Sequence, residues 1–409
     1  MPDQNRPVVS PPRVTVLGVT ARGWQDLPAH LRHLVIGADA VLGGRRHLDS
    51  LPEAAGQRRV VWPTPLRERL PGLLTDLGDV SVVALASGDP LVSGIGSTLV
   101  ELLGTENVDI IPAISSLALA RAELGWSAES CAVVSLVGRS PALVLRELAP
   151  GRRVLLLSSD ENTPQQVADL LTQAGYGASR LYVLGNLGTD DMARIEGTAA
   201  AWSHTVPRLN IIAAELAGPR LGGWVAGLPD SAYEHDGQLT KRDLRASALA
   251  RLAPAPGEHL WDVGAGAGSI GIEWMRAHPT CSATAVEADP ERAARIVRNA
   301  ATLGVPGLRV VTGAAPEALR DLPPPSAIFV GGGATAPGVM DRCLEALPMA
   351  GRLVVHGVTF ETERLLADLH SEHGGELTRI AVESAAPIGS YTGWKPSRTV
   401  TQWAFTRDA

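Results

Sequence analysis

The chain of 409 residues lacks the features that mark several protein classes. Its only cysteines are Cys131, Cys281 and Cys343, which are too far apart for a CxxC metal pair and indicate no disulfide framework, so a reducing cytoplasm fits. No apolar run of about 18 residues is available to span a bilayer. The formal net charge is −7, whereas general nucleic-acid affinity needs a basic surface. We therefore expect an ordinary cytoplasmic globular protein without membrane or nucleic-acid partners.

The length and the order of apolar runs predict two α/β domains. We expect a disordered proline-rich tail over 1–12, a first domain over 13–218, a linker over 219–235 and a second domain over 236–409. In the first domain, strands alternate with helical patterns, which predicts a largely parallel sheet, and Gly138 to Pro141 resembles a junction between two lobes. The expected strands are at 14–17, 40–42, 80–86, 107–111, 131–137, 153–157, 180–184 and 209–214.

The second domain repeats this alternation. A helix is expected over 240–252 with Thr240 as its N-cap, and another is expected to start at Asp289-Pro290-Glu291. Trp394 is expected in the core or in a pocket wall. His370 and His373 have helical spacing but flank an acidic residue at an exposed helix end, so no metal site is predicted. The expected strands are at 260–263, 283–286, 308–312, 327–330, 352–356 and 398–405.

The most informative stretch is the Asp-Val-Gly-Ala-Gly-Ala-Gly-Ser sequence of residues 262–269. It follows a predicted strand and leads into a predicted helix, and its three alternate glycines leave the backbone open to a ligand. Glu287 ends the next predicted strand, where a carboxylate can accept both hydroxyls of a ribose. This pattern predicts a site for a nucleoside-containing cofactor, although a tight strand-to-helix turn would give the same glycines.

The charge of this loop favours one class of cofactor. A dinucleotide places its pyrophosphate at a helix N-terminus, where fixed negative charge is unfavourable. We expect Asp262 to put a carboxylate at the mouth of the loop, which suits the sulfonium and ammonium groups of S-adenosylmethionine. A dinucleotide-type Gly-x-Gly-x-x-Gly frame exists only from Gly266 to Gly271, which begins too far past the strand.

Two loops in the first half have a similar placement. Gly88-Asp89-Pro90 follows the buried run at 80–86, and Pro112 to Ser116 follows another strand and opens a helix. Ligands of open sheets bind at the carboxyl ends of parallel strands. From the residues alone, these loops are either ligand-binding loops or simple strand-to-helix connections.

The first half resembles the tetrapyrrole methylases of cobalamin biosynthesis. The resemblance rests on the stretches 38–48, 82–98, 112–116 and 134–139. The second half is similar to the companion decarboxylating methyltransferase, a Rossmann-like class I fold, over 239–242, the glycine loop, 313–319 and 331–333. In this order, residues 13–405 resemble the fused decarboxylating C5,15-methyltransferases of that pathway. The chain departs from them in the loop Gly18–Gly23, where Thr20 replaces a glycine and Arg22 replaces a carboxylate.

The resemblance implies a fold, a reaction and two cofactor sites. The fold is a two-lobed tetrapyrrole methylase domain joined to a class I methyltransferase domain with a mostly parallel sheet. The first domain would methylate a corrin precursor at C5, and the second would methylate C15 and remove the carboxyl of the ring-C acetate. S-adenosylmethionine would bind one site in each domain, formed in the second by Thr240, Asp262, Gly264, Ala265, Gly266, Ala267, Gly268, Glu287, Gly313 and Ala315, and in the first by Gly88, Asp89, Ile95, Ser115 and Ser116.

A polycarboxylate tetrapyrrole also requires cations, preferably arginines that bind carboxylates in bidentate fashion. Arg245 is expected to be a solvated surface charge. No catalytic acid or base is identified, because the macrocycle carbon is itself the nucleophile and the methyl group arrives activated. The candidate substrate-binding residues are Arg45, Arg46, Arg139, Lys241 and Arg242, together with Gly331 and Gly332 for close approach of the substrate.

Two other functions remain open from the sequence. One is a nicotinamide-dependent reductase of the corrin pathway, and the other is a non-catalytic tetrapyrrole-binding protein. A homo-oligomer is expected. The sequence does not indicate whether the macrocycle carries cobalt.

Overall fold

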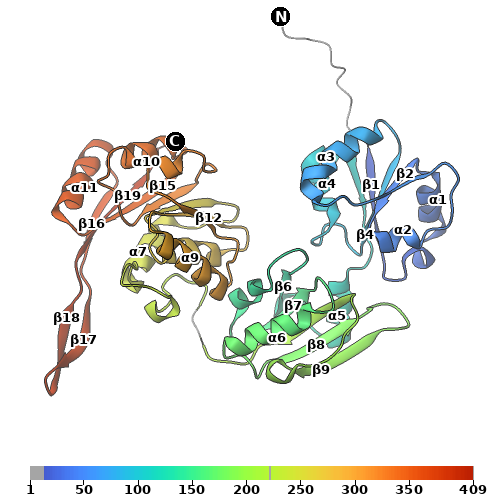
Figure 1. Ribbon diagram of the computed structural model, residues 1–409, viewed down its shortest axis with the longest axis horizontal. Coiled ribbons are helices and arrows are strands. Elements are labelled where there is room, and N and C mark those ends of the chain that lie inside the picture. Colours follow the sequence, from blue (N-terminus) through green and yellow to red (C-terminus); the bar gives the residue numbers. More distant parts are fainter. Residues whose placement is uncertain (1–12, 221–222, 409) are drawn as a thin grey trace, which may run out of the picture. The chain divides into compact units, whose positions relative to one another are not determined.

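The computed structural model describes residues 13–220 and 223–408 as two compact units (Figure 1). One consists mainly of the chain up to Leu216, and the other mainly of the chain from Ala217 onward. The expected tail over 1–12 lies outside the described residues. Within the described ranges, every helix is too short or too polar to cross a membrane.

The first sheet of the first unit is wholly parallel, with the strand order β3-β2-β4-β1-β5. Its central strand β4 is apolar from Val82 to Ala86, because alternate side chains enter hydrophobic clusters on opposite faces. The elements are β1 (Val14–Val19), α1 (Ala29–Gly37), β2 (Ala40–Gly43), α2 (Arg45–Asp49), β3 (Arg58–Val61), α3 (Leu66–Leu77), β4 (Val82–Ser87), α4 (Ile95–Leu103) and β5 (Val108–Ile111).

The second sheet of this unit is mixed, and the expectation of a largely parallel sheet is wrong here. Its order is β6-β7-β10-β8-β9, and β6 with β7 is the only parallel pair of neighbours in it. Buried apolar runs do not encode strand direction, so the sequence pattern could not reveal this. The elements are α5 (Ser116–Leu124), β6 (Cys131–Ser135), β7 (Arg153–Leu157), α6 (Thr163–Gln173), β8 (Arg180–Gly185), β9 (Ala193–Thr198) and β10 (Asn210–Glu215).

The predicted lobe junction is also misplaced. β6 already belongs to the second sheet, so Gly138 and Arg139 lie after the start of the second lobe, and Ser140–Pro150 belong to the second compact unit. The backbone N–H of Gly138 donates to Ser159 Oγ, and that of Leu136 donates to Leu157 O. The chain therefore changes lobe before β6.

The second unit is built on a seven-stranded sheet of order β13-β12-β11-β14-β15-β19-β16, in which only β19 runs opposite to the other strands. Side chains of α7, α8 and α9 contribute to the core on one face, and those of α10 and α11 to the core on the other. The elements are α7 (Arg242–Leu252), β11 (His259–Val263), α8 (Ser269–Ala277), β12 (Ser282–Glu287), α9 (Pro290–Thr302), β13 (Arg309–Thr312), β14 (Ala327–Val330), α10 (Val339–Ala346), β15 (Arg352–Gly357), α11 (Phe360–His373), β16 (Glu376–Ile380) and β19 (Val400–Thr406).

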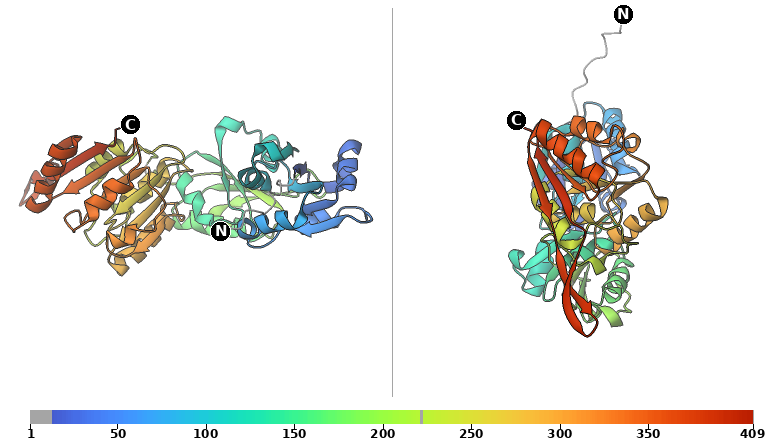
Figure 2. Two further views of the ribbon diagram at one scale, coloured as in Figure 1. Left: turned by 90° about the horizontal axis from the view of Figure 1, so that it is seen from above. Right: turned by 90° about the vertical axis from the view of Figure 1, so that its left-hand side faces the viewer.

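A hairpin that the sequence did not predict connects β16 to β19. Its strands β17 (Glu383–Ile388) and β18 (Tyr391–Pro396) pair only with each other and project from the seven-stranded sheet (Figures 1 and 2). Trp394 lies on this hairpin and is 71% exposed, so its expected place in a core or pocket wall is wrong.

The expected linker over 219–235 is partly folded into the second unit. Leu228 and Tyr233 are 4% and 5% exposed and belong to the core cluster that contains Trp274. The backbone N–H groups of Gly227 and Leu228 donate to the Glu273 carboxylate of α8. We refer to residues 227–240 as the approach segment.

Candidate functional site

The glycine loop of the second unit lies where the strand order of the sheet reverses. β11 is flanked by β12, which follows it in sequence, and by β14, which follows β13. Ligands of open α/β sheets bind at such switch points, outside the carboxyl ends of the strands. Two loops meet here, since a Cβ on Gly264 would lie 2.7 Å from Gly332 O. Gly264 also has φ +67°, so both backbone conformation and space require glycine.

Glu287 ends β12, as expected, and its carboxylate faces the glycine loop. It is 7% exposed, and its Oε2 accepts a hydrogen bond from the Gly266 N–H at 2.8 Å. Its Oε1 accepts from the Asp289 N–H at 3.1 Å. The predicted ribose acceptor and the predicted cofactor loop are therefore in direct contact.

Asp262 does not lie at the open mouth of the loop, which corrects the expectation from its position in sequence. Its side chain is 1% exposed and points into the unit, where Oδ2 accepts from the Gly271 N–H at 2.9 Å. Oδ1 is buried without a hydrogen-bond partner among the described residues. Burial is the main cause that raises the pKa of this carboxyl to about 7, and the charge of Glu287 acts in the same direction. Asp262 thus holds the first turn of α8 and presents no fixed surface charge.

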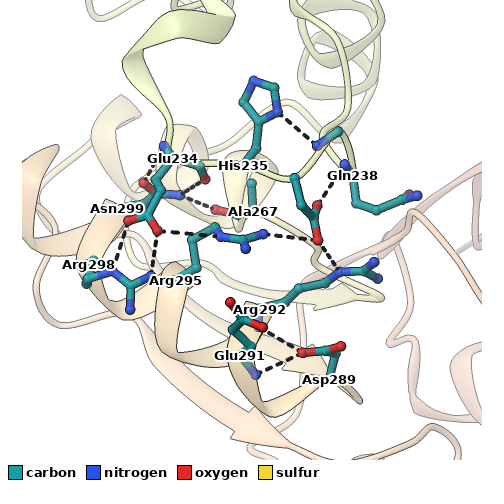
Figure 3. A network of polar contacts seen from close by, with 12 residues as sticks. Glu234, His235, Gln238, Ala267, Asp289, Glu291, Arg292, Arg295, Arg298 and Asn299 are labelled. Carbon is teal, nitrogen blue, oxygen red and sulfur yellow. Dashed lines mark hydrogen bonds and ion pairs between the residues drawn. The ribbon is translucent and has the colours of Figure 1, made fainter.

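The approach segment is fixed against the glycine loop by a polar network (Figure 3). Asn299 of α9 is 4% exposed, and its amide joins two elements: Nδ2 donates to Ala267 O and Glu234 O, and Oδ1 accepts from the Glu234 N–H. Two residues on, Asp236 Oδ2 contacts Arg292 Nε at 2.9 Å and Arg295 Nη1 at 3.2 Å. The hydrogen bond from the Gln238 N–H, together with these cations, holds the pKa of Asp236 well below its usual range.

The approach segment ends beside the loop. A Cβ on Gly266 would lie 2.8 Å from Gln238 O, so the segment closely contacts the loop backbone. The α9 helix that anchors it begins as the sequence predicts, with Asp289 as N-cap accepting from the Glu291 and Arg292 N–H groups.

Thr240 lies just before Lys241 and is not the N-cap of α7, because the helix begins at Arg242 and Lys241 holds the cap position. Its carbonyl instead accepts from Arg245 Nη1 at 2.5 Å. Arg245 is completely buried and pairs with Glu273, so the expectation of a solvated surface charge is wrong. An arginine is buried in this way only when a partner distant in the sequence pairs with it, so its burial cannot be predicted from the local sequence.

The other predicted residues of the second unit have mixed environments. Gly313 ends the neighbouring strand, and its N–H donates to Glu287 O at 2.9 Å, while Ala315 packs against the core cluster. The Gly331 N–H donates to Val263 O at the end of β11, which places the loop that begins at Gly331 beside the glycine loop. Lys241 and Arg242 are exposed, and Lys241 Nζ lies 3.7 Å from Asp230 Oδ2.

In the first unit, a cavity opens at the carboxyl ends of β1 and β4. Of the predicted residues, Gly88, Ser116 and Arg46 line it. Gly88 has φ +61°, and its carbonyl accepts from the Ala113 N–H, which joins the two predicted loops. The rest of the lining is Val19, Thr20, Ala21, Ser87, Ile114, Leu119, Leu184, Leu187, Leu209, Asn210 and Ile211, most of them apolar.

Other predicted residues of this unit serve the turns around the cavity. Asp89 Oδ1 accepts from the Leu91 N–H, and Ser115 Oγ caps α5 by accepting from the Ala118 N–H. Ile95 packs against a core cluster at the start of α4. Arg45 and Arg139 are exposed and do not line the cavity.

The loop Gly18–Gly23 keeps one glycine for close approach, because a Cβ on Gly18 would overlap Gly88 O. The two residues of this loop that depart from the family, Thr20 and Arg22, both have polar partners within the first unit. Thr20 Oγ1 lies 2.5 Å from Asp26 Oδ2. Arg22 reaches the second lobe, where Nη2 contacts Asp190 Oδ1 at 2.5 Å and Nε donates to Gly188 O. A cation thus replaces the carboxylate and joins the loop to the connection between β8 and β9.

Sequence reasoning missed three polar side chains that shape these sites. Asn299 and Glu273 lie inside helices and carry no motif, and His47 lies in α2, within the stretch 38–48 of the resemblance, which gave it no role. Their burial at 4%, 5% and 8% is the signal, since a polar side chain is buried only when partners compensate for lost water. The burial of these side chains is known only from the structure, so the sequence could not identify them.

Comparison with known proteins defines the class. Residues 13–202 match the family model of tetrapyrrole (corrin/porphyrin) methylases, and residues 231–407 match that of the precorrin methyltransferase domain. The two units thus belong to the methyltransferases of corrin precursors.

Whole-length relatives are more specific. The chain is 44% identical over 407 residues to a precorrin-6Y C(5,15)-methyltransferase [decarboxylating] of Sinorhizobium sp, covering 98% of both chains. It is 43% identical over 398 residues to the protein of the same name from Mycobacterium tuberculosis (strain CDC 1551 / Oshkosh), covering 96% of this chain and 100% of that one. A crystal structure of the C-terminal domain of precorrin-6Y C5,15-methyltransferase from Rhodobacter capsulatus is 45% identical, covers 46% of this chain and 100% of that chain, and has a TM-score of 0.44. The chain belongs to the precorrin-6Y C5,15-methyltransferase (decarboxylating) family.

Proposed function

We propose that the chain uses S-adenosylmethionine at two sites, one in each unit, to methylate precorrin-6Y or its cobalt analogue at C5 and C15, and that it removes the carboxyl group of the ring-C acetate. The first unit would act at C5, and the second at C15 and on the acetate. The substrate is an electron-rich macrocycle with many carboxylates, which suits a largely apolar cavity with Arg46 in its wall.

The observation that carries this proposal for the second unit is the contact between the Glu287 carboxylate and the glycine loop, in which Glu287 accepts from the Gly266 N–H. A diphosphate bound at this loop would compete for that N–H and lie beside the carboxylate. A cationic methyl donor avoids that repulsion, so the arrangement disfavours a nicotinamide-dependent reductase.

When bound, S-adenosylmethionine supplies an activated methyl group, so the chain needs no strong acid or base for the transfer. The glycine loop and Glu287 would hold the donor, and the Gly331-Gly332 loop would let the macrocycle approach closely. Alignment of two reactants in a dry site is worth up to roughly 7–11 kcal/mol. For decarboxylation, the conjugated ring is the electron sink, and the chain must orient and partly desolvate the acetate.

The test uses the full-length chain with precorrin-6Y and deuterated-methyl S-adenosylmethionine, followed by mass spectrometry of the product. We expect two labelled methyl groups and the loss of one carbon dioxide. Gly18→Ala should remove only the C5 methyl, because its Cβ would overlap Gly88 O, and Gly264→Ala should remove only the C15 methyl and the decarboxylation. A product without label, or a melting temperature raised by NADPH but not by S-adenosylmethionine, would contradict the proposal.

A further inference from the structure

In the first unit, the guanidinium of Arg46 contacts two polar side chains. Its Nη2 lies 2.9 Å from His47 Nε2 and 3.1 Å from Ser87 Oγ. Ser87 Oγ lies 3.2 Å from His47 Nε2, which closes a triangle of three contacts. The Arg46 Nη1 also lies 3.5 Å from Ala21 O, on the loop that follows β1.

The direction of the hydrogen bonds follows from the chemistry of the three groups. A guanidinium only donates, so His47 Nε2 must accept, and the imidazole proton sits on Nδ1. His47 is 8% exposed, and its Nδ1 is buried without a partner among the described residues. Burial, with a smaller effect from Arg46, lowers the pKa of His47 to about 4, so the ring is neutral near pH 7.

Arg46 is partly exposed and has no carboxylate within ion-pairing distance among residues 13–220. It lines the same cavity as Ser87 and Gly88. His47 and Ser87 share Nη2 and Ala21 O lies near Nη1, so the Nε–H and one Nη1 N–H remain available to donate to an incoming carboxylate.

We propose that His47 and Ser87 are positioning residues that fix Arg46 as the anchor for a ligand carboxylate in the cavity of the first unit. The carboxylate belongs either to the tetrapyrrole or to the amino-acid end of the methyl donor. The inference rests on the proposed function for the identity of these ligands, and it adds two residues to which the sequence gave no role.

The test measures C5 methylation and tetrapyrrole binding by the full-length chain. For precorrin-6Y and for S-adenosylmethionine, KM is determined in wild type and in Arg46→Met, Arg46→Lys, Ser87→Ala and His47→Leu. A direct absorbance titration with precorrin-6Y gives Kd without turnover. Arg67→Met is the matched control, because Arg67 is an exposed arginine of the same unit that pairs with Glu101 on the surface.

Arg46→Met is expected to raise the KM of one ligand by roughly tenfold or more while kcat and the C15 reaction stay near wild type. Arg46→Lys should recover only part of the affinity, since an ammonium keeps the charge but not the planar donors that His47 and Ser87 hold in place. Ser87→Ala and His47→Leu should raise the same KM by a smaller factor, and Ser87→Ala should add little in the Arg46→Met background. A rise for precorrin-6Y identifies the macrocycle as the source of the carboxylate, and a rise for the donor identifies the donor.

Two results would overturn the inference. One is an Arg46→Met variant with both KM values unchanged. The other is a Ser87→Ala variant, which removes an exposed hydroxyl, that matches wild type while Arg46→Met does not. Failure of the proposed function is distinct, because wild type would then form no C5-methylated product, whereas the Kd for precorrin-6Y would still report the effect of Arg46.

Discussion

Glu273 Oε1 and Arg245 Nε form an ion pair of 2.5 Å in which both side chains are withdrawn from solvent, with exposures of 3% and 0%. The same carboxylate accepts from the N–H groups of Gly227 and Leu228 and from the hydroxyl of Tyr233. The pair therefore fastens the start of the approach segment to α8, the helix that follows the glycine loop.

Replacement of Arg245 by methionine should strongly destabilise the second unit. It would leave the Glu273 carboxylate buried without its cation, and loss of one partner of a buried pair costs about 3–5 kcal/mol. Urea unfolding of the full chain would measure the change in the free energy of unfolding, and calorimetry would measure the change in melting temperature. Arg242→Met, at an exposed position of the same helix, should stay within about 0.5 kcal/mol of wild type. Equal effects of the two variants would disprove the assignment.

Replacement of Gly264 by alanine should impair both stability and the reaction of the second unit. A residue other than glycine is strained at a φ of +67°, which costs about 1–3 kcal/mol. The new methyl group would also overlap the backbone of Gly332. Gly332→Ala is the matched control for stability, because a Cβ there meets nothing within 4 Å. A Gly264→Ala protein with wild-type melting temperature and wild-type C15 methylation would refute the close approach of the two loops.

Asp262 should make the second unit less stable as pH rises. Because its pKa is raised to about 7 in the folded chain and is near 4 in the unfolded chain, the folded state binds the extra proton between these values. This contribution is complete below about pH 4 and is lost as pH rises to about 7. The free energy of unfolding from urea titrations should therefore have a falling component from about pH 4 to about pH 7 that Asp262→Asn lacks. Parallel pH profiles for the two proteins would contradict the prediction.

Asn299→Asp should weaken binding of S-adenosylmethionine in the second unit, although the substitution hardly changes the volume of the side chain. The new carboxylate would face Ala267 O and Glu234 O in place of an amide that donates to both. We expect the KM for S-adenosylmethionine in C15 methylation to rise about tenfold, with a smaller effect on the KM for precorrin-6Y.

The control for Asn299 is Arg298→Ala, one residue earlier in α9. Arg298 holds only the side chain of Glu234, at 2.6 Å, and both groups are about half exposed, so its loss should not alter the donor KM. A similar rise in both variants, or an equal rise for both ligands in Asn299→Asp, would count against a specific role for Asn299.

The sequence by itself determined the two-part α/β organisation and the glycine loop. Residues 262–269 carry glycine where only glycine fits, and Glu287 ends the strand beside them, because strand periodicity and backbone sterics are local properties. The predicted strand 327–330 agrees with β14, and the Asp289-Pro290 start of α9 agrees with its cap, for the same reason.

The direction in which each side chain points was decided only by the tertiary structure. Asp262 turns inward to Gly271, Arg245 is buried against Glu273, Trp394 projects on a hairpin, and Arg46 is held by His47 and Ser87. The mixed order of the second sheet of the first unit belongs to the same group. These outcomes depend on partners distant in the chain, and the free energy of burying a charge or pairing a strand is set by those partners, which local sequence patterns do not specify.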